Sequence, residues 1–350
     1  MAEGDGFTYE ESGVDVAAGN EAVRLLKERL KSARHPLVLE GIGGFGGAIR
    51  MPPIKDAVLV AGTDGAGTKV MLAKAMGRYD TIGIDVVAMS VNDVSALGAV
   101  PLFFLDYLVV GKLVPEQVAE LVAGVDEGCL QAQCVLLGGE TAEHPGHFAH
   151  DDDFDMGGFA VGMASRDELW GPAKVRDGDV VLGLASSGVH ANGFSLIRAI
   201  LRERQLDLSQ PFPDTGQTLG DVLLTPTIIY SPVLHDLGHA CGVHAAAHVT
   251  GGGFPDNLGR AVPAELAIEV DLDSWELPGV FTWLREAGVD DQEMLGTFNC
   301  GVGMVVIVPA DEVSRALDVV QKAGHGGWVV GKVIARGEGP AVRYRGSLWR

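Results

Sequence analysis

The stretch from Gly62 to Lys69 places residue types suited to phosphate chemistry in a single turn. It follows the apolar run Ala57–Val60, so a buried strand would lead into it. Its glycines let backbone amides approach an anion closely. Lys69 adds a positive charge, and Asp64 adds a hard oxygen ligand for Mg²⁺. The set suits a nucleotide polyphosphate, although its order differs from a Walker A loop. A plain glycine turn is the alternative interpretation.

Two further carboxylates could complete a magnesium site. Asp93 follows Asn92 inside an expected helix over 81–98, where both residue types are unfavourable. Glu140 lies in Gly-Gly-Glu-Thr after an expected short strand over 135–137. Magnesium usually takes one or two carboxylates together with water and nucleotide phosphates. The alternative for Asn92 and Asp93 is a solvated surface pair.

Two of the ten histidines have settings that suit catalysis. His190 and His248 each lie between an expected strand and an expected helix, beside small residues that leave room for a ligand. Histidine exchanges protons near neutral pH, so either could serve as a general base. The alternative is that both are structural.

The composition is that of a globular protein without a nucleic-acid surface. Of the 350 residues, 47% are hydrophobic and 21% charged, and the net charge of −21 disfavours nucleic acid and anionic membranes. Without a leader pattern or an apolar span of about 20 residues, we expect a soluble cytoplasmic protein whose first twelve residues are mobile. The cysteines lack zinc-site spacing, so we expect reduced, buried thiols.

The hydrophobic pattern predicts an α+β protein of two domains. Strands and helices mix without a strict βαβ repeat, and turn formers over 165–178 place the boundary between domains 1–168 and 169–350. We expect helices over 17–33, 81–98, 115–132 and 193–204, and strands over 57–62, 101–110, 135–137, 154–163 and 179–185.

These landmarks, in this order, resemble the phosphoribosylformylglycinamidine cyclo-ligase (AIR synthetase) family along nearly the whole chain. The sequence departs from the family in Ser90, where cysteine is frequent, in Ala66, where valine is usual, and in the segment His144–His147. The resemblance rests on the segments 13–20, 41–47, 62–69, 84–93, 102–107, 138–143, 186–193, 224–227, 248–253 and 297–304.

The resemblance implies an ATP- and Mg²⁺-dependent homodimer. Its N-terminal domain would pair with its mate into a β-barrel, and its C-terminal domain would be α+β. The reaction would close formylglycinamidine ribonucleotide to 5-aminoimidazole ribonucleotide, with ADP and phosphate, through an iminophosphate, in purine biosynthesis.

The resemblance also implies residue roles. ATP would contact Gly43, Gly44, Gly46, Gly47, Asp64, Gly65, Gly67, Thr68, Lys69, Asn92 and Asp93. Mg²⁺ would bind Asp64, Asp93 and Glu140, and His190 or His248 would move the proton. Substrate would contact Ser187, Gly188, Asn192, Gly251, Gly252 and Gly253, and we expect the last three to bind its phosphate ahead of a helix.

Related families are less well matched. Selenophosphate synthetase and thiamine-monophosphate kinase share the architecture, but the former carries a reactive cysteine near the first glycine loop, and no cysteine precedes Cys129. A hydrogenase-maturation relative would need a C-terminal cysteine, whereas this chain ends Ser-Leu-Trp-Arg. A non-catalytic scaffold on the same fold would be expected to have lost Asp64, Asp93, Lys69 or His248.

Overall fold

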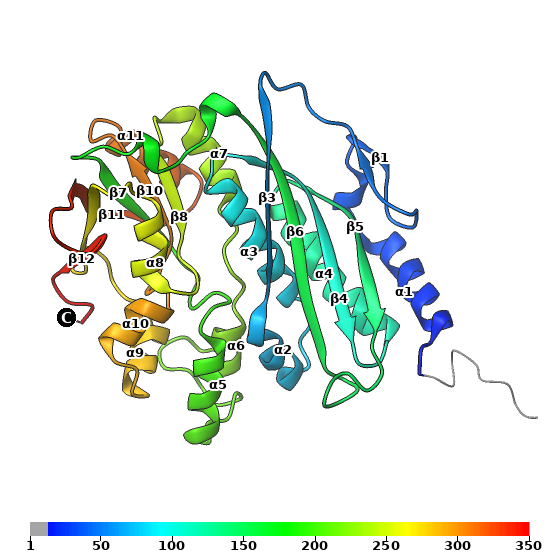
Figure 1. The fold of residues 1–350 in the computed structure, drawn as a ribbon. Coiled ribbons are helices and arrows are strands. Elements are labelled where there is room, and N and C mark those ends of the chain that lie inside the picture. Colours follow the sequence, from blue (N-terminus) through cyan, green and yellow to red (C-terminus); the bar gives the residue numbers. More distant parts are fainter. Residues whose placement is uncertain (1–12, 350) are drawn as a thin grey trace, which may run out of the picture.

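The computed structural model describes residues 13–349, so the expectation for the first twelve residues lies outside the described part. Two main sheets form the framework (Figure 1). A four-stranded sheet has the order β3-β6-β4-β5, and a six-stranded sheet has the order β12-β9-β11-β7-β10-β8. A small hairpin, β1 (Val38–Glu40) with β2 (Ala48–Ile49), carries the first glycine loop.

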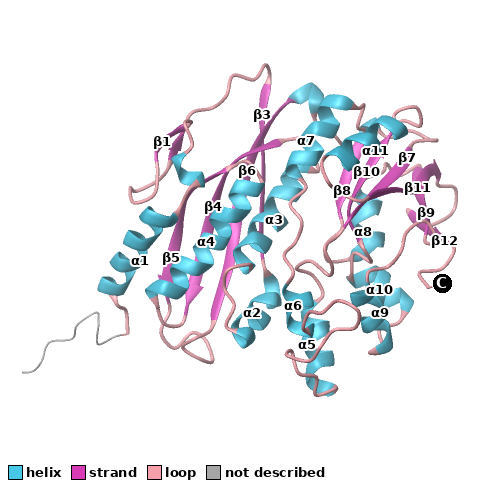
Figure 2. Cartoon of the chain, turned by 180° about the vertical axis from the view of Figure 1, so that it is seen from behind, coloured by secondary structure: helices cyan, strands magenta, loops and turns pink. Residues whose placement is uncertain are grey.

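The four-stranded sheet is covered by helices on one face only. It contains β3 (Ala57–Gly65), β4 (Val100–Val110), β5 (Val135–Glu143) and β6 (Phe154–Ser165). Figure 2 shows α3 and α4 in front of the strands, whereas the opposite face carries no helix in Figure 1. The helices of this half are α1 (Val16–Arg29), α2 (Val70–Met76), α3 (Ile82–Ser95) and α4 (Pro115–Gln131).

The uncovered face of this sheet is apolar. Strand register places Phe159 beside Thr63 and Leu105, and Tyr107 beside Gly157, all on one side of the sheet. Leu59 is 61% exposed, Tyr107 48% and Phe159 40%. A surface of this kind commonly marks a contact with another protein.

Helix α3 is the central helix of the molecule. It is apolar nearly all round, which is the pattern of a helix enclosed by other elements, and every residue in it is buried except Asp93. Gly83 allows α3 and α4 to approach closely, because a Cβ there would lie 2.3 Å from the backbone nitrogen of Val125. The exposure of Asp93 therefore stands out within this helix.

The C-terminal half is a mixed sheet with helices, which confirms the predicted α+β class. The β9–β12 pair is parallel and the other pairs are antiparallel, and β10 is buried along its whole length. The strands are β7 (Val180–Ala185), β8 (Ala245–His248), β9 (Leu266–Asp271), β10 (Val302–Val308), β11 (Gly327–Ala335) and β12 (Val342–Arg345). The helices are α5 (Phe194–Glu203), α6 (Leu219–Leu224), α7 (Ser231–Ala240), α8 (Gly253–Arg260), α9 (Gly279–Glu286), α10 (Asp291–Thr297) and α11 (Val313–Lys322).

Four strands are longer than predicted, and the two largest extensions affect the site. β3 continues to Gly65, so Asp64 lies in the strand rather than in the following turn. β5 continues to Glu143, so Glu140 also lies within a strand. Each extension is stabilised by backbone pairing with a neighbouring strand, which overrides the glycines in these segments.

The two sheets are joined by residues 166–179, which include two short 3₁₀ turns. We propose that the domains divide there, at 168/169.

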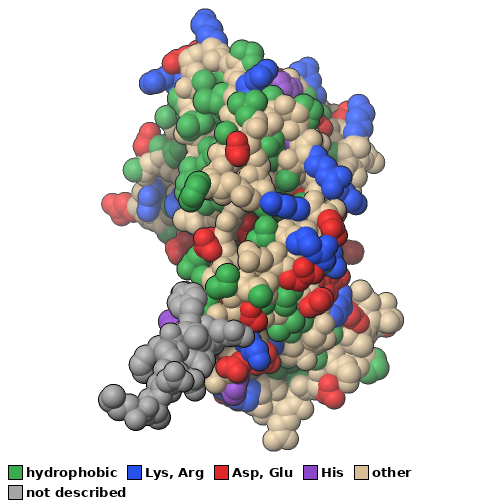
Figure 3. All heavy atoms as spheres, turned by 90° about the vertical axis from the view of Figure 1, so that its right-hand side faces the viewer, with side chains coloured by type: hydrophobic (Ala, Val, Ile, Leu, Met, Phe, Trp, Pro, Cys, Tyr) green, Lys and Arg blue, Asp and Glu red, His purple; other side chains and the backbone are tan. Residues whose placement is uncertain are grey.

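The four cysteines are free and buried. On the side of the molecule seen in Figure 3, acidic and basic side chains are interspersed with apolar ones. Among residues 13–349, each helix is too short or too polar to cross a bilayer.

Candidate active site at the domain junction

Asp64 and Asp93 come together as the sequence predicted. A Cβ on Gly62, two residues before Asp64 on the same face of β3, would lie 4.0 Å from Cβ of Asp93. The protein around Asp64 partly desolvates it and raises its pKa; the Gly65 amide, which donates to its carboxylate at 2.8 Å, lowers it, and the Asp93 charge raises it again. A divalent cation between the two carboxylates would relieve that repulsion, so the pair fits Mg²⁺.

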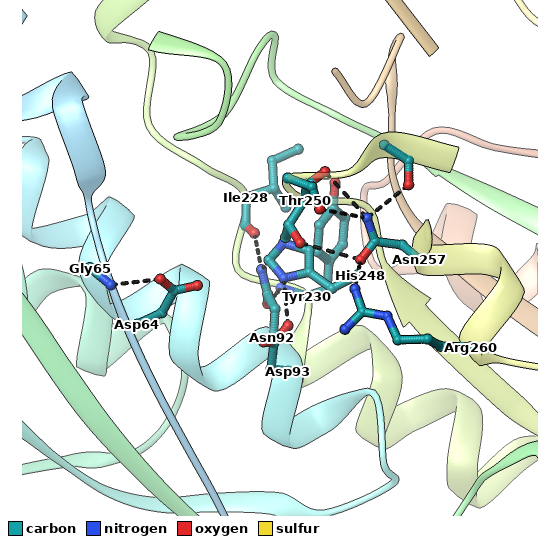
Figure 4. A network of polar contacts seen from close by, with 12 residues as sticks. Asp64, Gly65, Asn92, Asp93, Ile228, Tyr230, His248, Thr250, Asn257 and Arg260 are labelled. Carbon is teal, nitrogen blue, oxygen red and sulfur yellow. Dashed lines mark hydrogen bonds and ion pairs between the residues drawn. The ribbon is translucent and has the colours of Figure 1, made fainter. Parts of the chain in front are cut away.

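His248 connects this pair to the C-terminal domain. Its Nδ1 lies 3.0 Å from a carboxylate oxygen of Asp93, and its Nε2 lies 3.4 Å from the amide nitrogen of Asn92 (Figure 4). Because the amide nitrogen of Asn92 can only donate, Nε2 accepts, and we assign the ring proton to Nδ1, which donates to Asp93. Two neighbouring residues of α3 thus hold a buried histidine in one orientation and one tautomer.

The structure gives Asn92 a different role from the predicted nucleotide contact. Its side-chain oxygen accepts the backbone N–H of Tyr230 at 2.7 Å, and its nitrogen donates to the carbonyl of Ile228 at 2.8 Å. These contacts, with His248, use the polar atoms of a fully buried amide. Asn92 therefore fastens α3 to the segment before α7 and orients His248, and no atom remains for ATP.

Lys69 likewise cannot reach a phosphate, which corrects the sequence prediction. Its side chain is 0% exposed, and its ammonium donates to Asp85 at 3.0 Å and to the carbonyls of His190 at 2.9 Å and Thr225 at 2.8 Å. Three acceptors use its three protons. The 3₁₀ turn Gly67–Lys69 leads directly into α2 and directs the side chain inward. The sequence did contain one signal for this: Asp85 lies within the apolar segment of α3, where a buried carboxylate needs a cation beside it.

His190 is also an interior residue. Its Nε2 accepts the backbone N–H of Ser187 at 3.2 Å, its Nδ1 has no partner among residues 13–349, and its backbone φ is +62°. Burial lowers its pKa well below the usual histidine value. His190 is thus neutral and packed, whereas His248 lines a cavity.

The predicted glycine loop lies at the other edge of the sheet. Residues 41–47 close over a cavity of about 560 Å³ whose walls include Phe103, Tyr107 and Glu140. Gly43 has φ of +107°, and a Cβ there would lie 2.5 Å from the ammonium of Lys27. The lysine beside the loop is therefore Lys27, on an exposed position of α1. The sequence analysis did not identify it, because nothing in the pattern of that helix distinguishes it.

Glu140 is separated from the aspartates by the width of the sheet. Glu140 pairs with Tyr107, Tyr107 with Gly157, and Gly157 with Gly65. Three strand spacings amount to about 14 Å. Among the described residues, no group of three or more His, Cys, Asp or Glu could hold one metal ion. The predicted metal triad is therefore not assembled within one chain.

One of the predicted substrate residues, Asn192, lies close to the end of β3 that carries Asp64. Asn192 lines a cavity of about 480 Å³ together with Asp64, Gly65 and Gly67, and its side chain has no partner among the described residues. A Cβ on Gly251 would lie 3.7 Å from the Asn192 amide, so these two loops meet. The Thr68 hydroxyl lies 3.1 Å from that of Ser195, at the start of α5.

Other predicted substrate contacts are used internally. The hydroxyl of Ser187 donates to the carbonyl of Pro226 at 2.6 Å. Gly188 is buried, and its carbonyl accepts hydrogen bonds from the Ser186 hydroxyl and the Asn299 amide nitrogen, both at 2.9 Å. A Cβ on Gly253 would lie against the carbonyl oxygen of Leu295, so this glycine is needed for packing.

Comparisons with known proteins agree with this architecture. Residues 47–164 match the family model of the AIR synthase related protein N-terminal domain, and residues 176–342 match that of the C-terminal domain. Thiamine-monophosphate kinase from Stenotrophomonas maltophilia K279a is 18% identical, with a TM-score of 0.67 over 95% of this chain and 96% of that one. Hydrogenase maturation protein HypE in complex with ATP is 20% identical, with a TM-score of 0.65 over 95% and 92%.

A longer protein shares the fold as well. PurL from T. maritima, complexed with AMPPCP, is 17% identical, with a TM-score of 0.56, and the match covers 97% of this chain and 48% of PurL. At these identities the similarity to the solved structures establishes a common fold.

Proposed function

Because this chain belongs to the superfamily of AIR synthase related proteins in both of its domains, we propose that it is a phosphoribosylformylglycinamidine cyclo-ligase. It would use ATP to close formylglycinamidine ribonucleotide to 5-aminoimidazole ribonucleotide in the purine pathway of the cytoplasm. The observation that carries the proposal is the contact of His248 with Asp93, next to Asp64. It places a proton acceptor beside a carboxylate pair suited to a nucleotide-bound metal.

The chemistry needs an activated leaving group and a base. The formamide oxygen of the substrate attacks the γ-phosphorus of ATP, the bond to ADP breaks, the formamide nitrogen loses its proton, and an iminophosphate results. The amidine nitrogen then attacks the activated carbon, the carbon–oxygen bond breaks, and phosphate leaves. The attacking nitrogen loses a proton in this step. Both steps depend mainly on positioning and on stabilisation of charge.

His248 is the proposed proton acceptor. Because Nδ1 carries the ring proton, Nε2 is the ring atom that can take a proton, and its only hydrogen-bonding contact within residues 13–349, with Asn92, is long at 3.4 Å. The Asp93 carboxylate at Nδ1 would stabilise the imidazolium that forms. In this proposal His190 has a structural role. Its backbone carbonyl accepts a hydrogen bond from Lys69, and its neutral ring is packed in the interior. Mg²⁺ held by Asp64 and Asp93 would supply positive charge to the phosphates.

We further propose a homodimer formed through the uncovered face of the four-stranded sheet. Its exposed Leu59, Tyr107 and Phe159 suit a contact with the same face of a second copy. A twofold axis across that face would bring the β5 edge of one chain to the β3 edge of the other. Glu140 and the glycine loop of one copy would then complete the site around Asp64 of its mate.

The test is ADP release from ATP and Mg²⁺, with and without formylglycinamidine ribonucleotide, measured together with the aminoimidazole product. We expect release that depends on substrate and matches product one for one. The Asp64→Asn protein is the control, and it should remain folded while losing most turnover. Nucleotide binding without substrate-dependent turnover would overturn the proposal.

A further inference from the structure

A second cavity opens on the side of Asp93 that faces α8. Its volume is about 270 Å³, and its polar lining comes from Asp93, His248, Thr250, Asn257 and Arg260. Figure 4 shows Asp64 on one side of Asp93 and His248, and Asn257 and Arg260 on the other. The proposed reacting groups therefore lie between the metal-binding edge and a cavity that contains an arginine.

Arg260 is held in place from one side only. Asn257 is 3% exposed, and its side-chain nitrogen donates to the carbonyl of Gly253 at 2.8 Å. Its oxygen accepts hydrogen bonds from the Arg260 Nη2 and from the Thr250 hydroxyl, the latter at 3.4 Å. The Arg260 Nε donates to the carbonyl of Asp256 at 3.2 Å. One buried amide thus orients both a guanidinium and a hydroxyl.

The remaining N–H donors of the Arg260 guanidinium have no hydrogen-bond partner among the described residues. No hydrogen bond to its Nη1 and no ion pair with a carboxylate exists among residues 13–349. An oriented guanidinium with free donors beside a cavity is suited to an anion, and to a phosphate in particular.

We infer that Arg260 binds the phosphate monoester of the ribonucleotide substrate. The inference rests on the proposed function and names the group that anchors its substrate. The phosphate would lie in the α8 cavity, the reacting formamide and amidine beside His248, and ATP on the Asp64 side. The negatively charged Asp93 also faces this cavity. Its carboxylate is hydrogen-bonded to His248.

This location replaces the glycine turn as the phosphate site. A Cβ on Gly252 would lie 2.6 Å from a carboxylate oxygen of Asp256, so an acidic side chain already covers the first turn of α8. A phosphate dianion placed there would meet that negative charge. Gly251 remains exposed and close to Asn192, so the turn can still contact other parts of a substrate.

The experiment compares Arg260→Ala and Arg260→Lys with the control Arg202→Ala, which removes an exposed arginine from the last turn of α5. For Arg260→Ala we expect KM for the ribonucleotide to rise by about 10- to 100-fold, with KM for ATP unchanged. Arg260→Lys should give an intermediate rise, because it keeps the charge without the fork. Arg202→Ala should match the parent enzyme. An unchanged KM for the ribonucleotide in Arg260→Ala would overturn the inference.

A binding measurement separates this inference from the proposed reaction. Ribose 5-phosphate should raise the melting temperature of the parent and Arg202→Ala proteins, but not that of Arg260→Ala. If the parent fails to cyclise the ribonucleotide yet shows this pattern, the proposed function fails and the phosphate site stands. If the parent cyclises it and ribose 5-phosphate stabilises all three proteins equally, the phosphate site alone is wrong.

Discussion

The two edges of the N-terminal sheet carry different groups of the candidate site. At the β3 edge, Asp64 is backed by α3 and connects through Asp93 and His248 to the C-terminal domain. At the β5 edge, Glu140 and the glycine loop line a cavity that faces away from that domain junction. The first edge has carboxylates without a glycine loop, and the second has a glycine loop beside Glu140 and the buried Asp106. In the proposed dimer, a site that used both sets of groups would combine the edges of two chains.

The largest expected effect contrasts the two lysines of these edges. Lys69→Met should lower the free energy of unfolding by about 3–5 kcal/mol, because it leaves the buried Asp85 carboxylate without its cation. Lys27→Met should leave stability unchanged, because that side chain is exposed, and should raise KM for ATP. Denaturant unfolding and ATP kinetics measure the two effects. The double variant Lys69→Met/Asp85→Asn is the control and should recover part of the stability. A stable Lys69→Met protein with a raised KM for ATP would restore the sequence-based interpretation.

The next effect tests whether the edges of two chains combine. Asp64→Asn and Glu140→Gln should each reduce kcat by about 100-fold or more as homodimers, because each removes charge stabilisation from every site. A hybrid dimer, purified through two different tags, would contain one site with both changes and one intact site. We therefore expect the hybrid to recover about half of the parent activity, by the site count of a dimer.

The hybrid dimer would give a different result if each site lay within one chain. If Asp64 and Glu140 acted within the same chain, each site of the hybrid would carry one of the two changes. The hybrid would then be as inactive as the homodimers. Its activity thus decides between a site within one chain and a site shared between two, once the tags have confirmed that the hybrid has formed.

Local sequence signals predicted the β3 edge better than the β5 edge. Asp64 and Asp93 meet because a strand and the helix packed on it present side chains with simple periodicities, which sequence reveals. The separation of Glu140 depends on strand order, with β4 and β6 inserted between β3 and β5. No local pattern encodes that order.

The remaining differences between the predicted and the observed site depend on partners that are distant in the sequence. Lys69 points inward because its acceptors include backbone carbonyls of the C-terminal domain, more than 100 residues away. Lys27 and Arg260 occupy ordinary exposed helix positions, where charged residues are usual. Their relevance appears only when a glycine loop or a cavity is placed beside them.

The smallest expected effect concerns how the two edges respond to pH. Burial lowers the pKa of His190, on the β3 side, so its contribution to stability is complete above about pH 6.5 and is lost as the pH falls. Burial raises the pKa of Asp106, beside Glu140, to about 7, so its contribution is present at low pH and is lost as the pH rises towards 7. Between pH 5 and 6.5 the two trends oppose each other, each with a slope of at most about 1.4 kcal/mol per pH unit. Asp106→Asn should therefore make stability rise with pH in this range. His190→Asn, which suits the positive φ, should make it fall. Denaturant unfolding at pH 5 and 6.5 measures both slopes, and an unchanged profile in Asp106→Asn would mean that this carboxyl is ionised throughout.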